Sequence, residues 1–127
     1  MNLLAVLIAG IAYFVLGIIW YSEAVFGKQW MKMTGVKEMK PTPVKMAVGI
    51  VISIIPAYVL AILISFMGTL TLASGLIAGF FAWLGFVATL SLSPVLWEKQ
   101  PLNLYFLNNA YNLASFLLMG AIIALMG

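Results

Sequence analysis

Polar side chains recur at helical spacing in the apolar segment near the end of the chain. Asn108, Asn112 and Ser115 stand at positions i, i+4 and i+7, so they share one face of a helix. An amide in hydrocarbon is costly unless it is paired, so this face should meet other helices or a water-filled cavity. Tyr111 lies beside this face, and other segments of the chain contribute a threonine and a glutamate. The candidate polar site therefore comprises Asn108, Asn112, Ser115, Tyr111, Thr89 and Glu23.

Two kinds of chemistry suit this set of residues. The first is a polar vestibule open to the cytoplasm, which binds a neutral solute, or a cation through carbonyl-type oxygens. The second is a set of hydrogen bonds that hold helices together, each contributing roughly 0.6–2 kcal/mol within a membrane. The first interpretation indicates a transporter or channel for a small solute or ion, and the second indicates a structural role.

Glu23 also supports two interpretations. It directly follows an apolar run that ends in Trp20 and Tyr21. In the first turn of an interfacial helix its charge would be favoured by the helix dipole, with Lys28 or Lys99 as a partner. Alternatively, it is a carboxylate that binds a proton or a cation at a cytoplasmic mouth.

The composition narrows the possible functions. The chain of 127 residues is 65% hydrophobic and 7% charged, and it contains no Cys, no His and no Asp. A soluble domain carries about a quarter charged residues, so the lipid bilayer is the expected solvent. Without Cys, His or Asp we expect no catalytic residues, no metal site and no cofactor. The six lysines are too few and too scattered for a nucleic-acid surface.

Segments long and apolar enough to cross a bilayer predict an all-α fold: a four-helix membrane bundle that forms one domain over 1–127. A spanning helix needs about 20 apolar residues. The expected helices cover about 3–21, 46–67, 72–95 and 104–126. The first lacks the basic start of a signal peptide, so we expect it to be retained. The residues Gly68 to Thr71 form the expected turn between the second and third helices.

The residues from 22 to 34 predict a short amphipathic helix that lies in the membrane interface. Phe26, Trp30 and Met33 share one face, with Ser22 as the expected N-cap and Gly35 as the expected end. The segment Lys40 to Pro43 should then be extended, because it contains two prolines. The expected interfacial anchors are Trp20, Tyr21, Phe26, Trp30, Trp97 and Tyr105.

The lysines predict the orientation of the chain in the membrane. Five lie between the first and second helices, and Lys99 lies between the third and fourth. Because cytoplasmic loops carry an excess of lysine and arginine, the loops 22–45 and 96–103 are expected in the cytoplasm. Both termini should then lie outside, and we expect the cell membrane as the location.

Small residues form stripes along the helices and predict close packing. They let helix backbones approach one another in lipid, and they suit contacts within the chain as well as those of a homo-oligomer. The expected packing positions are Gly49, Ser53, Ala57, Ala61, Gly75, Gly79 and Gly85.

Two stretches resemble a known family. The first runs from Gly17 through Trp20-Tyr21-Ser22 to Phe26-Gly27-Lys28-Gln29-Trp30-Met31-Lys32, and the second runs from Asn108 to Gly120. Both stretches resemble sequences of the domain of unknown function 1761 family. The length of the chain and its number of expected helices also resemble that family. Glu23 stands where many relatives are expected to have proline. The resemblance implies the four-helix architecture and no assigned activity.

From these observations we expect a non-enzymatic membrane subunit that forms homo-oligomers or binds a partner protein. The alternative is a transporter or channel for a small solute or ion, through the polar face of the last helix.

Overall fold

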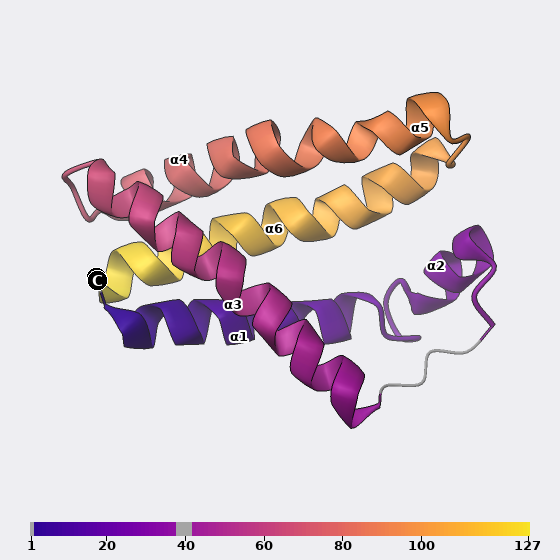
Figure 1. The fold of residues 1–127 in the computed structure, drawn as a ribbon, viewed down its shortest axis with the longest axis horizontal. Coiled ribbons are helices and arrows are strands. Elements are labelled where there is room, and N and C mark those ends of the chain that lie inside the picture. Colours follow the sequence, from indigo (N-terminus) through magenta and orange to yellow (C-terminus); the bar gives the residue numbers. More distant parts are fainter. Residues whose placement is uncertain (1, 38–41) are drawn as a thin grey trace.

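The computed structural model describes residues 2–37 and 42–127 and has four helices long and apolar enough to cross a membrane (Figure 1). The all-α prediction with four spans is therefore confirmed. The first span is α1, Leu3–Trp20, the second is α3, Pro43–Phe66, and the last is α6, Leu102–Met126. The third span, Leu72–Trp97, is divided into α4 (Leu72–Trp83), η1 (Leu84–Ala88), η2 (Leu90–Leu92) and α5 (Ser93–Trp97).

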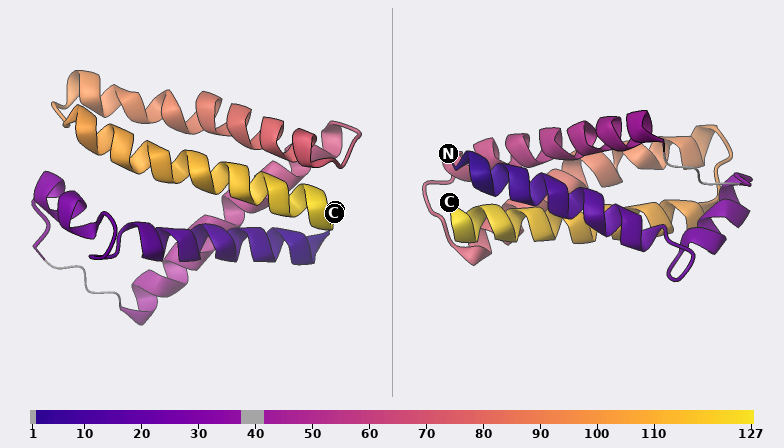
Figure 2. Two further views of the ribbon diagram at one scale, coloured as in Figure 1. Left: turned by 180° about the vertical axis from the view of Figure 1, so that it is seen from behind. Right: turned by 90° about the horizontal axis from the view of Figure 1, so that it is seen from below.

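Helix α6 lies between α4 and α1, and α3 crosses the other spans at a slant (Figures 1 and 2). Both termini and the turn between α3 and α4 lie at one end of the bundle, which we call the terminal end. The short helix α2 (Gly27–Thr34) and the connection from α5 to α6 lie at the other end, which we call the α2 end. The loop from α1 to α3, which contains α2, and the loop from α5 to α6 therefore lie at the same end of the bundle.

Small residues lie at several of the contacts between helices. Ser53, Ala57 and Ala61 are buried along α3, where they line one face at intervals of four residues. Gly49 is half-buried, and a Cβ there would meet the ring of Phe14 at 2.8 Å. The core beneath these residues is formed by side chains from all four spans: Val6, Ala9, Ala57, Leu60, Ala61, Ile64, Ala78, Ala82, Phe116, Met119 and Ile123.

Helices α4 and α6 approach each other backbone to backbone. A Cβ added to Gly75 would collide with the carbonyl oxygen of Gly120, and a Cβ added to Gly79 would collide with that of Phe116. Glycine is required at these points because the two backbones touch. Gly85, further along the third span, has no described atom within 4 Å of the Cβ position, so it has no such role inside the chain.

The turn before α4 forms as its residue types predict. Gly68 has a φ of +74°, in the left-handed region that favours glycine. Thr71 caps α4, because its side chain accepts a hydrogen bond from the backbone N–H of Ser74. The Ser74 hydroxyl accepts in return from the backbone N–H of Thr71 over 3.0 Å. The pair satisfies N–H groups that a helix start leaves without a partner.

Ser74→Ala is expected to destabilise the bundle by about 1–2 kcal/mol, because it removes this reciprocal cap at a buried site. Unfolding of the purified protein in one fixed detergent measures the effect. Ser65→Ala is the matched control, since Ser65 is exposed and bonds only its own helix; its free energy of unfolding should stay within about 0.5 kcal/mol of the wild type. Equal losses in the two variants would contradict this role of Ser74.

The short interfacial helix begins later than expected. Helix α2 starts at Gly27, and Phe26 precedes it without any side-chain cap. The prediction that Ser22 caps this helix is wrong: its hydroxyl donates to the carbonyl of Ile19 in α1, and its own carbonyl accepts from the N–H of Gly27 over 2.8 Å. The chain reverses tightly over residues 21–26, and a Cβ at Gly27 would collide with the carbonyl of Tyr21. The expected end at Gly35 is confirmed by its φ of +76°.

The second span begins earlier than expected, at Pro43 rather than at Met46. Thr42 has extended backbone angles and accepts a hydrogen bond from the N–H of Lys45 over 3.2 Å, and Pro43 fills the first helical position. Proline is favoured there, since its missing N–H would have no partner in the helix. The expected extended connector therefore ends at Thr42, and its residues Lys40 and Pro41 lie outside the described residues.

Candidate functional site

A cleft of about 570 Å³ opens at the α2 end, between the end of α1, α2, the third span and α6. Its lining combines amides with aromatic rings, and phenols are the only ionisable side chains that the described residues contribute to it. The lining residues are Tyr21, Trp30, Ser91, Pro94, Gln100, Leu104, Tyr105, Asn108, Asn109, Tyr111 and Asn112.

Two tyrosines hold the amides of Asn108 and Asn112. The Tyr21 hydroxyl donates to the side-chain oxygen of Asn108 over 2.6 Å, and the Tyr13 hydroxyl donates to that of Asn112 over 3.0 Å. The Tyr111 hydroxyl donates to the backbone carbonyl of Tyr13 over 2.8 Å. The oxygen of each amide therefore accepts a hydrogen bond from a tyrosine in α1 or directly after it. The nitrogen of each amide has no acceptor among the described residues.

Asn109 has a different environment from its two neighbours. It is buried, with 4% of its surface exposed. Its amide nitrogen donates to the Ser91 hydroxyl over 3.0 Å and to the backbone carbonyl of Tyr105 over 3.1 Å. This amide connects α6 to the third span, so it serves packing and its donors are occupied.

The other predicted members of the polar site lie apart from the cleft. Ser115 is fully buried, and its hydroxyl has no hydrogen-bond partner among the described residues. Thr89 is exposed and donates to the backbone carbonyl of Gly85 over 2.9 Å. Glu23 is exposed in the turn before α2 and does not line the cleft. Of the six predicted residues, the cleft brings together Asn108, Asn112 and Tyr111.

The distortion of the third span explains why Ser91, and not Thr89, reaches α6. Residues 84–88 form a π-helix and 90–92 a 3₁₀ turn, so the side chains rotate relative to a regular helix. The Tyr105 hydroxyl donates to the carbonyl of Ala88 within this irregular segment, over 2.7 Å. Hydrophobic periodicity gives no signal for such a change of pitch, so the sequence did not show that Ser91, rather than Thr89, faces α6.

Residues expected to be interfacial anchors line the cleft as well. The rings of Tyr21 and Trp30 meet edge to face with centroids 5.9 Å apart, and those of Tyr21 and Tyr111 at 5.4 Å. Burial, with a smaller contribution from Tyr13, raises the pKa of the Tyr21 hydroxyl to about 12, so it remains a donor at neutral pH. Trp20 is half-buried against Phe26, with ring centroids 4.8 Å apart.

The bundle is packed on the far side of Asn112. The rings of Tyr13 and Phe116 meet edge to face at 6.1 Å, and Met119 has no exposed surface. The contact between Gly75 and Gly120 lies further toward the terminal end. The cleft therefore leads from one end of the bundle to a closed core.

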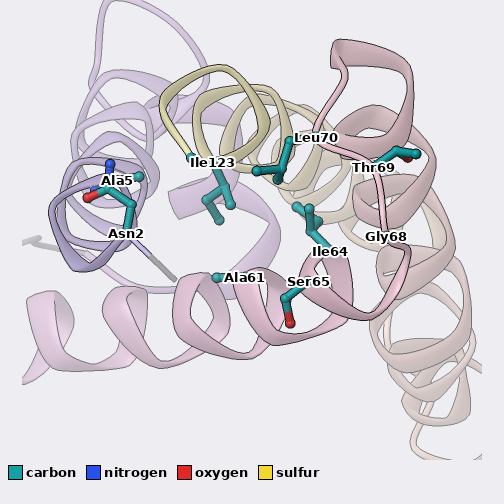
Figure 3. A pocket seen from close by; sticks show the side chains of 10 residues that line it. Asn2, Ala5, Ala61, Ile64, Ser65, Gly68, Thr69, Leu70 and Ile123 are labelled. Atoms are coloured by element: carbon teal, nitrogen blue, oxygen red, sulfur yellow. The ribbon is translucent and has the colours of Figure 1, made fainter.

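A second, smaller cavity of about 270 Å³ lies at the terminal end (Figure 3). Ile64, Leu70 and Ile123 give it largely apolar walls, and Asn2 lies at its edge. The Asn2 side chain is committed to structure: its oxygen caps α1, and its nitrogen donates to the carbonyl of Met126 over 2.9 Å. This cavity offers little for polar recognition.

The four apolar spans and the loops that join them define a small polytopic membrane protein. The chain belongs to the family described as protein of unknown function (DUF1761), whose model matches residues 4–124. The resemblance seen in the sequence is thereby confirmed. Comparison with curated proteins and with solved structures gives no match.

Proposed function

We propose that this protein is a non-enzymatic membrane carrier that binds a small polar solute in the cleft at the α2 end. One observation carries the proposal: the amides of Asn108 and Asn112 are held by tyrosine hydroxyls, with both amide nitrogens left without an acceptor among the described residues. Amides that only joined helices would use their donors as Asn109 does. Unpaired donors at the wall of a cleft favour the binding of a ligand.

The closed core beyond Asn112 favours a carrier over an open channel. A carrier holds its solute between two gates and opens them alternately. Packing around Phe116 and Met119 would be the closed gate. Helix α6 supplies both the amides and that packed segment, so movement of α6 against α1 would couple binding to opening.

We propose that the cleft faces the cytoplasm and that both termini lie outside, in the cell membrane. Lys28 and Lys32 lie on α2, Lys37 follows this helix, Lys45 lies in the first turn of α3, and Lys99 follows α5. All five are exposed and lie at the α2 end. Since lysine-rich loops stay in the cytoplasm, the distribution supports this orientation.

Cysteine labelling tests the water-filled cleft, because the natural chain contains no cysteine. In sealed vesicles, a membrane-impermeant thiol reagent is expected to modify Gln100→Cys and Asn108→Cys from the cytoplasmic side only. Met119→Cys, in the packed core, should react at least about tenfold more slowly, since a core closed to water excludes the reagent. Thr69→Cys, in the turn at the terminal end, should react from the opposite side.

The same experiment can reject the proposal. If Asn108→Cys is as protected as Met119→Cys while Gln100→Cys still reacts, the amides lie in a dry interface and join helices only. Labelling of Gln100→Cys from the outer side would reverse the proposed orientation.

A further inference from the structure

The cleft leaves free two hydrogen-bond donors on α6, the side-chain N–H₂ groups of Asn108 and Asn112. The side-chain oxygens of Asn108 and Asn112 already accept from Tyr21 and Tyr13, so the amides present their N–H₂ groups. The Tyr21 hydroxyl cannot donate a hydrogen bond to a ligand as well, because its single O–H already donates to Asn108. A ligand that offers only donors would leave two desolvated amide nitrogens unpaired, which is unfavourable. The cleft therefore favours a ligand with acceptor atoms.

The charge of the site favours an uncharged ligand. Among the described residues, no lysine or glutamate lines the cleft. An ion buried there without a counter-ion would lose its hydration, at a large cost in free energy. The exposed lysines at the same end, Lys28 and Lys32 on α2 among them, add a positive potential that repels cations.

The walls of the cleft favour a flat ring. The ring of Tyr21, at the end of α1, meets the rings of Trp30 on α2 and Tyr111 on α6 edge to face, with centroids 5.9 Å and 5.4 Å apart. Aromatic faces of this kind hold a planar ring by stacking or edge-to-face contact. The volume of about 570 Å³ is within the range of small-molecule sites.

We propose that the ligand of this cleft is an uncharged, planar ring compound that carries a carbonyl-type acceptor. This inference rests on the proposed function and adds the chemical class of the solute. Asn108 and Asn112 would donate to the acceptor atoms, while the aromatic walls hold the ring. The two tyrosine hydroxyls determine the specificity, because they decide which end of each amide faces the ligand.

Three probes with the same ring test the proposal: neutral benzamide, anionic benzoate and cationic benzylammonium. Binding to the full-length protein in lipid nanodiscs is measured by ligand-observed NMR titration. Benzamide should bind at least about tenfold more tightly than benzylammonium, with benzoate between them. Asn108→Leu and Asn112→Leu should each weaken benzamide binding about tenfold, the equivalent of about 1.4 kcal/mol. Asn103→Leu, an exposed position at the start of α6, should leave it unchanged.

Tyr21→Phe separates a specificity role from a structural one. It releases the Asn108 oxygen, so the amide can turn and accept a hydrogen bond from a ligand. The preference for benzamide over benzylammonium should fall at least threefold, while the folded yield stays equal to that of Tyr58→Phe on the exposed face of α3. Equal affinity of the three probes, no binding of any of them, or an unchanged preference in Tyr21→Phe would overturn the inference. None of these results alters the cysteine labelling, so the proposed function is judged separately.

Discussion

Gly75→Leu is expected to destabilise the bundle by about 3 kcal/mol or more, because even a Cβ at this position collides with the carbonyl of Gly120. The colliding atoms belong to a backbone, so no side-chain rotation relieves the clash. Helix α4 would have to move away from α6 and lose the packing of Ala78 and Ala82. Reversible unfolding in mixed micelles, followed by tryptophan fluorescence, measures the loss.

Gly85→Leu is the matched control for Gly75→Leu, because it makes the same substitution in the same span. The Cβ position of Gly85 has no described atom within 4 Å. The free energy of unfolding should therefore change by less than about 1 kcal/mol. If both variants lose stability equally, the loss does not come from the contact between Gly75 and α6.

Asn109→Leu is expected to destabilise the protein by about 1–2 kcal/mol. The change removes the two hydrogen bonds to Ser91 and Tyr105 and leaves the Ser91 hydroxyl without that partner. Because Ser91 belongs to the irregular part of the third span, that wall of the cleft should also loosen. Hydrogen exchange of the amides near Ser91, together with the unfolding free energy, measures both consequences.

Asn108→Leu is the comparison for Asn109→Leu. Asn108 is only half-buried and makes one hydrogen bond, to Tyr21, so its loss should cost less than about 1 kcal/mol. The order of the two effects is the test. A larger loss for Asn108→Leu would mean that the amides at the cleft support the fold and that Asn109 does not.

Local composition determined the four spans. In hydrocarbon, a backbone must form its own hydrogen bonds, so a long apolar run has to be helical whatever its neighbours are. Local sequence also determined where helices end at Gly35 and Gly68, because each position needs a left-handed backbone that glycine adopts without strain. These features depend on residues close in sequence, and they could be predicted without tertiary information.

The polar site depended on contacts between distant residues. Helical periodicity placed Asn108 and Asn112 on one face, but it could not show that Tyr21 and Tyr13, at sequence separations of 87 and 99, would bind their oxygens. Nor could it show that Asn109 would find Ser91, because the π-helical segment changes which side of the third span faces α6.

Sequence alone therefore determined that the protein has four apolar helices with amides in the last one. Only the tertiary structure decided which amides join helices and which present free donors to a cleft. The physical reason is that a repeat along one helix fixes the direction of its side chains, whereas a hydrogen bond between helices also requires the position and rotation of the partner helix.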